Sequence, residues 1–469
     1  MRNQKIVLLD GTGKDDEDLL PVLDMLMGEL QRSGATVQTF PLRKLKLGSC
    51  IGCFGCWVKT PGICVEPDAG REIAQAMIQS DIVILFTPVT FGGYSSAIKK
   101  IQDRWIPLVL PDFEMVHGEV HHQPRYARYP RLVGIGVQRQ PHDAEASLFK
   151  VLVGRNALNF HAPTYAAEVV LNTDTPEQVH QQLQTALVRN DALPTGKMAK
   201  SWMSATKAPP ESVAVMDSPG RALLIIGSPK VKPLGGPSSL RGRVNPPSNS
   251  GILGGYVLEQ LKQRRWETES LTLRRNLLRG EGQTEFLAAV DRADLILLAF
   301  PLYIDSLPFL LIKSLEAIAQ HLSTHAPERP KRLAAITNNG FPEAHHNALA
   351  LAICQQFASD TGMIWTGGLA LGAGEAVIGG QPLESPQRAG RPPVKHVIQA
   401  LDMASAALAD GQVIPGEAAK LMTKTPIPLV PLGLWRWLFI KMAKQHWRQG
   451  AAGNQVNEAA LFAQPYAEV

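Results

Sequence analysis

Three apolar, strand-like segments of this sequence occur twice, in the same order, between 201 and 216 residues apart. The pairs are Val7–Lys14 with Leu223–Lys230, Asp81–Phe91 with Asp294–Ile304, and Arg131–Val137 with Arg332–Asn338. Chance seldom keeps both order and spacing, so the sequence predicts two copies of one domain in tandem.

Strand-like and helix-like segments alternate within each half. In the first half we expect strands near 5–10, 35–41, 81–87, 131–138 and 164–171, and helices near 17–33, 70–79, 95–106, 143–158 and 176–190. In the second half we expect strands near 221–227, 267–273, 294–300, 332–337 and 365–371, and helices near 250–264, 284–292, 308–321, 345–360 and 393–409.

The strands are rich in Val, Ile and Leu, which is typical of parallel sheets covered on both faces. Alternation with helices implies right-handed crossovers. We therefore predict an α/β fold with two doubly wound, five-stranded parallel sheets of order 2-1-3-4-5, each with a ligand crevice at the carboxyl ends of its strands. The expected boundaries are 1–193, a linker at 194–218, 219–412, and a helical C-terminal extension at 413–469, with insertions near 48–66 and 231–249.

Charge and composition exclude some classes of protein. Forty-seven basic and 42 acidic residues give a net charge of +5, too weak and mixed to indicate nucleic-acid binding. A strand-like start without a basic, apolar leader predicts no signal peptide, and no apolar run is long enough to span a membrane. We expect a cytoplasmic protein.

Four of the five cysteines lie in one short segment, at Cys50, Cys53, Cys56 and Cys64. Thiolates two residues apart can wrap a small iron–sulfur cluster, and a fourth from the next loop can close the site. Zinc held by four thiolates and redox-active thiols without metal are the alternatives. Cys354 lies on an apolar helix and is expected to be a buried core thiol.

The loops after the two first strands differ. The second half offers Ser228 and then Ser248, Asn249 and Ser250 before a helix, which suits a phosphate, although helix capping explains the same residues. The first half has Gly11 to Lys14 followed by four acidic residues, which repel a phosphate and favour a weakened or lost site.

The loop after the third strand of the first half contains Thr87, Pro88, Val89, Thr90, Phe91, Gly92 and Gly93. Its glycine pair permits close approach to a flat ligand, which Phe91 and Tyr94 could cover; a capped strand-to-helix turn is the alternative. The tandem histidines, His121–His122 and His345–His346, are expected at surface or cap positions. The Trp-containing segment 426–447 is expected to pack on the second domain or a dimer partner, with a membrane interface as the alternative.

The cysteine run and the segment from Asp81 to Arg104 resemble the NADPH-dependent FMN reductase and iron–sulfur flavoprotein group of the flavodoxin-like superfamily. The resemblance covers about residues 5–170 and again about 220–375. It implies FMN at the carboxyl ends of the strands, NAD(P)H as co-substrate, and a [4Fe–4S] cluster on the cysteines in some members. It places the flavin ring against residues 87–93 of the first domain. In the second domain it places phosphate at Ser228, Ser248, Asn249 and Ser250, and the ring at Pro301, Leu302, Tyr303, Asn338, Asn339 and Gly340.

These observations predict an FMN-dependent NAD(P)H oxidoreductase that transfers electrons through bound flavin, with no side chain required as acid or base. Its partners would be small-molecule or protein electron donors and acceptors. A homodimer and a peripheral membrane contact through the C-terminal segment are further expectations. The alternative is a degenerate flavodoxin-like scaffold for protein or membrane interaction, and a zinc-stabilised structural domain is a weaker third hypothesis.

Overall fold

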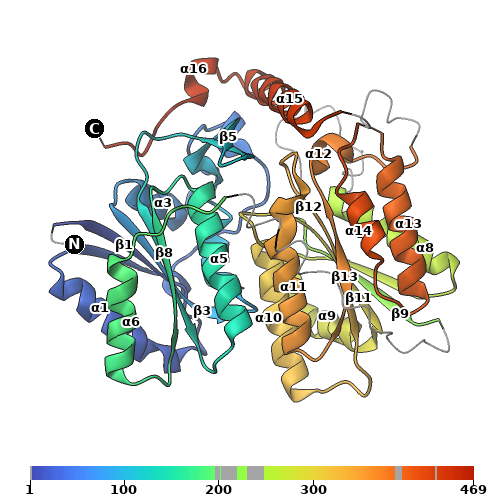
Figure 1. The fold of residues 1–469 in the computed structure, drawn as a ribbon, viewed down its shortest axis with the longest axis horizontal. Helices are drawn as coiled ribbons and strands as arrows, with labels where there is room; N and C mark the ends of the chain where they lie inside the picture. Colours follow the sequence, from blue (N-terminus) through green and yellow to red (C-terminus); the bar gives the residue numbers. More distant parts are fainter. Residues whose placement is uncertain are drawn as a thin grey trace. The chain divides into compact units, whose positions relative to one another are not determined.

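The computed structural model describes residues 3–195, 201, 219–229, 248–385, 393–427 and 430–468. They form two compact units (Figure 1). The first contains 3–195 and 440–468, and the second contains the other described residues. The predicted linker 194–218 and the predicted insertion 231–249 fall almost entirely outside the described residues.

The sheet of the first unit has five parallel strands in the order β2-β1-β3-β7-β8. These strands are β1 (Lys5–Asp10), β2 (Thr36–Pro41), β3 (Ile82–Thr90), β7 (Arg131–Gln138) and β8 (Tyr165–Leu171). A short β4 (Gly93–Tyr94) turns back antiparallel to the end of β3.

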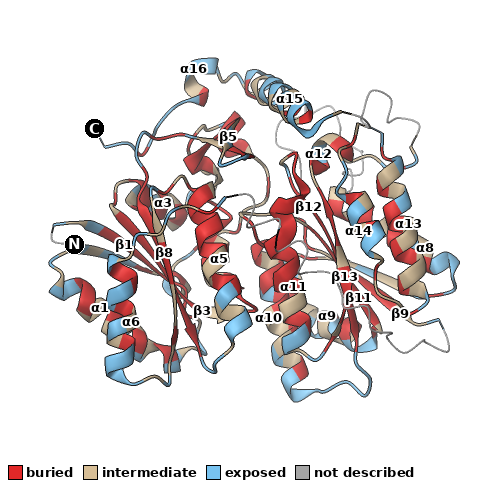
Figure 2. Cartoon of the chain, in the orientation of Figure 1, coloured by how far each residue is buried: buried red, intermediate tan, exposed pale blue. Residues whose placement is uncertain are grey.

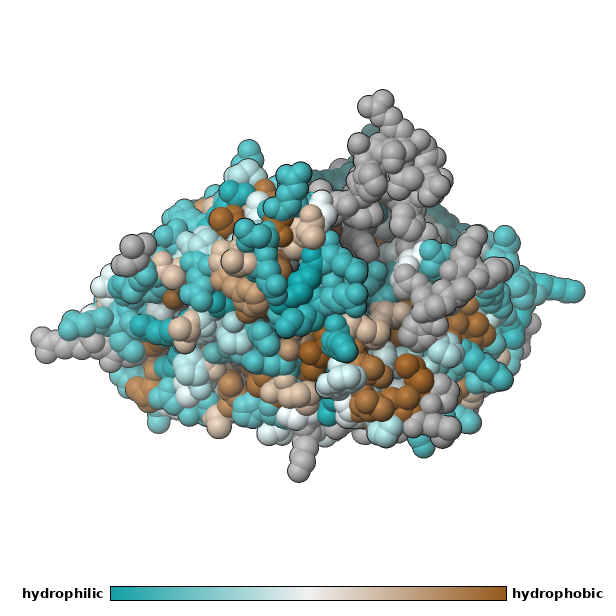
Figure 3. All heavy atoms as spheres, turned by 90° about the horizontal axis from the view of Figure 1, so that it is seen from above, coloured by the Kyte–Doolittle hydropathy of each residue, from teal (hydrophilic) through white to brown (hydrophobic). Residues whose placement is uncertain are grey.

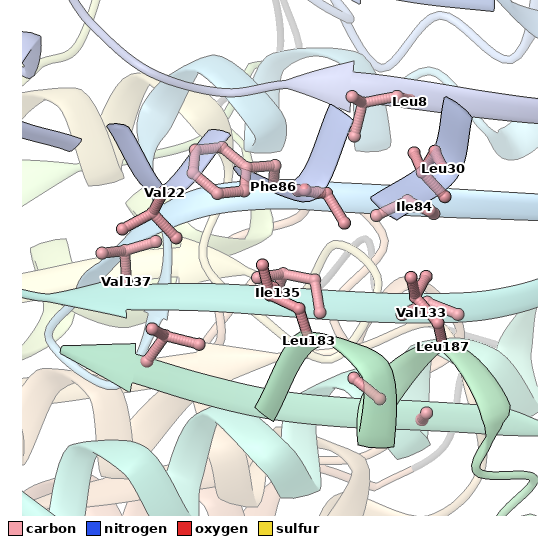
Figure 4. Close-up of a cluster of buried hydrophobic side chains, with 14 of the residues drawn as sticks. Leu8, Val22, Leu30, Ile84, Phe86, Val133, Ile135, Val137, Leu183 and Leu187 are labelled. Carbon is pink, nitrogen blue, oxygen red and sulfur yellow. The ribbon is translucent and has the colours of Figure 1, made fainter. Parts of the chain in front are cut away.

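Helices cover both faces of this sheet because its inner strands are apolar on both sides, and β1, β3 and β7 are accordingly buried in Figure 2. The helices are α1 (Leu20–Arg32), α3 (Ala69–Ile78), α4 (Ser96–Gln102), α5 (Asp143–Asn159) and α6 (Pro176–Val188). Side chains of β1, β3 and β7 pack against α1 and α6 in one apolar cluster, which includes Leu8, Phe86, Ile135 and Leu183 (Figure 4).

The second unit repeats the arrangement with the order β10-β9-β11-β12-β13. Its strands are β9 (Arg221–Ile226), β10 (Glu267–Thr272), β11 (Leu295–Pro301), β12 (Arg332–Asn338) and β13 (Ile364–Leu371). Its main helices are α8 (Asn249–Gln263), α9 (Gly280–Arg292), α10 (Phe309–Thr324), α11 (Ala348–Asp360) and α13 (Lys395–Ala409), followed by α14 (Gly416–Met422). Both sheets therefore confirm the predicted order 2-1-3-4-5.

Some elements were not predicted. A helical turn, α2 (Gly55–Val58), lies inside the cysteine segment, and an antiparallel hairpin of β5 (Val109–Val116) and β6 (Glu119–Pro124) precedes β7. The C-terminal extension is helical, as predicted, and forms α15 (Leu432–Gly453) and α16 (Glu458–Leu461).

Among the described residues, no helix is long and apolar enough to cross a membrane. Figure 3 shows hydrophobic side chains in small groups among hydrophilic ones on the face seen from above.

Candidate functional site: a cluster of four thiols

The four cysteines of the first unit line one cavity, together with apolar side chains and the polar residues Ser49, Glu66, Asp103 and Arg104. Left-handed backbone at Gly52 (φ 62°), Phe54 (φ 52°) and Gly62 (φ 84°) folds the segment back on itself. The cysteines that the sequence singled out are therefore brought together in space, as a thiolate metal site requires.

Hydrogen bonds from the backbone prepare two of these sulfurs for a negative charge. The N–H of Gly52 donates to Cys50 Sγ and the N–H of Gly55 donates to Cys53 Sγ, and each nitrogen-to-sulfur distance is 3.4 Å. Burial nevertheless raises the pKa of the Cys50 thiol to about 12 and also raises the pKa of Cys53 and Cys56. These thiols are protonated at neutral pH unless a metal displaces the protons.

The donor set fits a thiolate-bound metal centre. The space between the thiols is about 20 Å³, which is room for about one water molecule. As the thiols stand, no three of their sulfurs lie within 4.8 Å of one another, so a single ion held by three or more of them requires the loop to tighten. A four-iron cluster requires the glycine-rich loop to open.

Asp68 and Arg104 tie the ends of the cysteine segment to the domain. Asp68 caps α3 and accepts from the N–H of Gly48 at 2.6 Å, and Arg104 donates to both of its carboxylate oxygens at 2.6 and 2.7 Å. Burial acts to raise the pKa of Asp68, but the hydrogen bonds from Gly48 and Arg104 outweigh it and the pKa is lowered.

The loop after β1 is closed by its own carboxylates. Asp10 Oδ1 accepts from the N–H and the hydroxyl of Thr12, at 2.9 and 2.6 Å, and Asp16 Oδ2 accepts from the N–H of Gly13 at 2.6 Å. A phosphate at this place would need the same N–H groups and would meet both negative charges. The first loop therefore does not fit the phosphate of FMN.

The loop after β3 folds as a tight hairpin on α5. Thr87 is fully buried and its hydroxyl accepts from the N–H of Ser95 at 3.0 Å. Phe91 and Gly92 have positive φ angles of 53° and 75°, and the N–H of Gly92 donates to Glu145 at 2.9 Å. Pro88, Val89, Thr90 and Gly93 complete the hairpin. The residues expected at the flavin ring thus lie together, but Glu145 takes one of their N–H groups.

In the second unit, the residues expected at phosphate lie around the N-terminus of α8. Ser248 caps the helix by accepting from the N–H of Gly251 at 3.1 Å. Asn249 donates to Glu375 and accepts from the N–H of Gly380, both at 2.9 Å. Ser228, after β9, is buried.

The structure joins this helix end to the loop after β12, because Asn338 Nδ2 donates to Ser250 Oγ at 2.9 Å. Asn339 donates to the carbonyl of Glu343 at 2.8 Å, whereas a Cβ built on Gly340 would meet only open space. After β11, the N–H of Leu302 donates to the carbonyl of Asn338 at 2.7 Å, and Tyr303 pairs with Ser306 in a tight turn after Pro301.

The prediction of surface or cap positions for the histidines is wrong. His121 is buried and His122 is half-buried on β6, and His345 and His346 are buried before α11. His121 Nε2 lies 2.8 Å from Glu119, which also pairs with the fully buried Arg155. The sequence carries no pattern for this network, since its residues come from a hairpin and a helix that are far apart in sequence. Cys354, as predicted, is fully buried.

A family of known proteins matches most of the first unit. The NADPH-dependent FMN reductase family matches residues 5–170. The first domain is therefore similar to this family over most of its length. The match ends at residue 170, so descent of the second domain from the same ancestor by duplication stays a prediction.

The chain is also similar to iron–sulfur flavoproteins of archaea. One from Archaeoglobus fulgidus is 34% identical over 86 residues, which is 18% of this chain and 38% of the relative. One from Methanocaldococcus jannaschii is 30% identical over 104 residues, 22% of this chain and 53% of the relative. The chain thus spans between a third and about half of the length of these relatives.

Among solved structures, the chain is similar to an NAD(P)H:quinone oxidoreductase from Methanothermobacter marburgensis. The match has 12% identity and a TM-score of 0.30, and covers 39% of this chain and 95% of that one.

Proposed function

We propose that this protein is an FMN-dependent NAD(P)H oxidoreductase whose first domain carries a thiolate-bound iron–sulfur centre. The observation that carries the proposal is the convergence of Cys50, Cys53, Cys56 and Cys64 on one cavity, inside a domain similar to the FMN reductase family. The names of the curated relatives support the same pairing of flavin and cluster. FMN would supply hydride and single-electron chemistry, and the protein would bind and orient it.

We further propose that FMN binds at the second domain. The N-terminus of α8 offers backbone N–H groups and the hydroxyls of Ser248 and Ser250, with Asn338 fixed beside them. Gly340 leaves open space next to Asn338 and Asn339, where a ring would lie. In the first domain, Asp10 and Asp16 occupy the corresponding N–H groups.

FMN titration of flavin-depleted protein tests this placement, with riboflavin as the ligand that lacks phosphate. Asn249→Asp adds one negative charge at the α8 terminus and should weaken FMN binding about tenfold while leaving riboflavin binding unchanged. Lys14→Gln makes the same change of charge in the first loop and should leave both affinities unchanged. A loss of FMN affinity in Lys14→Gln but not in Asn249→Asp would place the phosphate in the first domain.

A second function is favoured by one observation, namely that the carboxylates of Asp10 and Asp16 accept hydrogen bonds from the N–H groups of the first loop. If both domains have lost flavin, the chain is a flavodoxin-like scaffold for interaction. Protein that binds no FMN in the titration and does not oxidise NAD(P)H with a quinone or free flavin as acceptor would establish this alternative.

Two expectations about partners remain proposals. The exposed apolar side chains Leu434, Trp437 and Met442 on α15 support a peripheral contact with a membrane or protein surface. Homodimerisation stays a prediction, and so do the identities of the electron donor and acceptor.

A further inference from the structure

The C-terminal segment, residues 440–468, packs on the cysteine segment within the first unit. The ring of Trp447 on α15 lies 5.3 Å from that of Phe54 and 4.8 Å from that of Trp57, centroid to centroid. Phe54 lines the cysteine cavity. Trp447 therefore packs against Phe54 of the cavity wall, in an apolar cluster that also contains Trp57, Val58 and Ile106.

A second contact follows α16. Buried Arg125 donates to the carbonyls of Leu461 and Ala463, at 2.9 and 2.8 Å, and to the carbonyl of Pro107, another residue of the cavity wall, at 2.8 Å. A Cβ on Gly62 would lie 2.6 Å from Pro465. The cysteine loop and the chain terminus thus approach so closely that only glycine fits at position 62.

Charged and polar groups hold the segment between and beyond these contacts. Arg448 forms a bidentate ion pair with Asp112, with nitrogen-to-oxygen distances of 2.6 and 2.9 Å. Gln79 donates a hydrogen bond to the carbonyl of Tyr466 at 3.3 Å. Tyr466 itself is buried. Residues from 447 to 466 are therefore anchored at several independent points around one site.

We propose that residues 440–468 are a structural part of the cysteine site, which keep its four thiols enclosed and protect a metal centre bound there from water and oxidants. The expectation that residues 426–447 pack on the second domain is wrong for residues 440–447, which belong to the first unit. The inference on thiol enclosure is independent of the metal, whereas the protection of the centre rests on the proposed function.

Alkylation by iodoacetamide, followed by mass spectrometry of each cysteine peptide, tests the enclosure in the full chain, as purified and after treatment with a chelator and a reductant. Trp447→Ala should speed alkylation of the four clustered cysteines about tenfold. Trp437→Ala, on the same helix but with its ring 57% exposed, should leave the rate unchanged. Cys354 is an internal control because it is fully buried in the second unit.

A chain that ends at Gly453 keeps Trp447 but removes the contacts of Arg125 and Gly62, and the same acceleration is expected. Loss of the first unit's cooperative unfolding in urea identifies a variant that has unfolded there, and the other variant then decides; exposure of Cys354 reports unfolding of the second unit. Wild-type rates in both folded variants would overturn the inference, whether or not metal is present. In metal-loaded protein, the variants should lose visible absorbance in air about tenfold faster than wild type; a metal-free wild type would instead overturn the proposed function.

Discussion

Asp10 and Asp16 each place a carboxylate oxygen on backbone N–H groups of the loop where a phosphate is expected in this fold. The acidic run after Gly13 already predicted a weakened site, because like charges repel. Which N–H group each acid would take could not be predicted, since that depends on a turn only a few residues long. Close by, Arg139 neutralises Asp18 and its hydrogen bond lowers the pKa of that carboxyl.

The ionised carboxylate of Asp68 is expected to stabilise the first unit. Its folded pKa lies below the ordinary value of 3.8, so its ionised form stabilises the fold above about pH 4 and this contribution is lost as the pH falls through the folded pKa. Asp68→Asn should lower the free energy of unfolding by about 2 kcal/mol at pH 7, measured with urea. The difference from wild type should shrink below pH 4. The exposed Asp15→Asn serves as control, and a deficit that does not change with pH would contradict the assignment.

Among the elements, the ten sheet strands and the helices between them were predicted because their apolar pattern is local and strong. The β5–β6 hairpin was missed because Pro107, Pro111 and Pro124 interrupt its pattern, and buried charges such as Glu119 oppose a strand prediction. The turn α2 was missed because a glycine-rich segment of four helical residues carries no periodicity.

The hairpin after β3 depends on glycine at position 92. Its φ of 75° is costly for other residues, and a Cβ there would lie 2.6 Å from Leu148 on α5. Gly92→Ala should lower the free energy of unfolding by about 3 kcal/mol. Gly118→Ala is the matched control, since its φ is 87° but nothing lies within 4 Å of the added Cβ. Gly118→Ala should lower the free energy of unfolding by about 1 kcal/mol. If both variants lower it equally, the contact between residue 92 and α5 is unimportant.

For the whole molecule, the sequence predicted two sheets of one order but could not predict that the chain returns at Ile440 to the first unit. Contacts such as Arg125 with Leu461 join residues 336 positions apart and leave no local signal. The proposed pairing of a thiol cluster with flavin likewise involves the whole chain, because the four cysteines lie in the first domain and the proposed FMN site lies in the second.

The most direct test is a cofactor count on anaerobically purified, full-length protein. We predict about four irons and four sulfides per chain, as in a [4Fe–4S] cluster, together with about one FMN. A variant with Cys50, Cys53 and Cys56 replaced by serine should hold no iron and keep its FMN. One zinc per chain without sulfide, or iron that survives the triple substitution, would contradict the account.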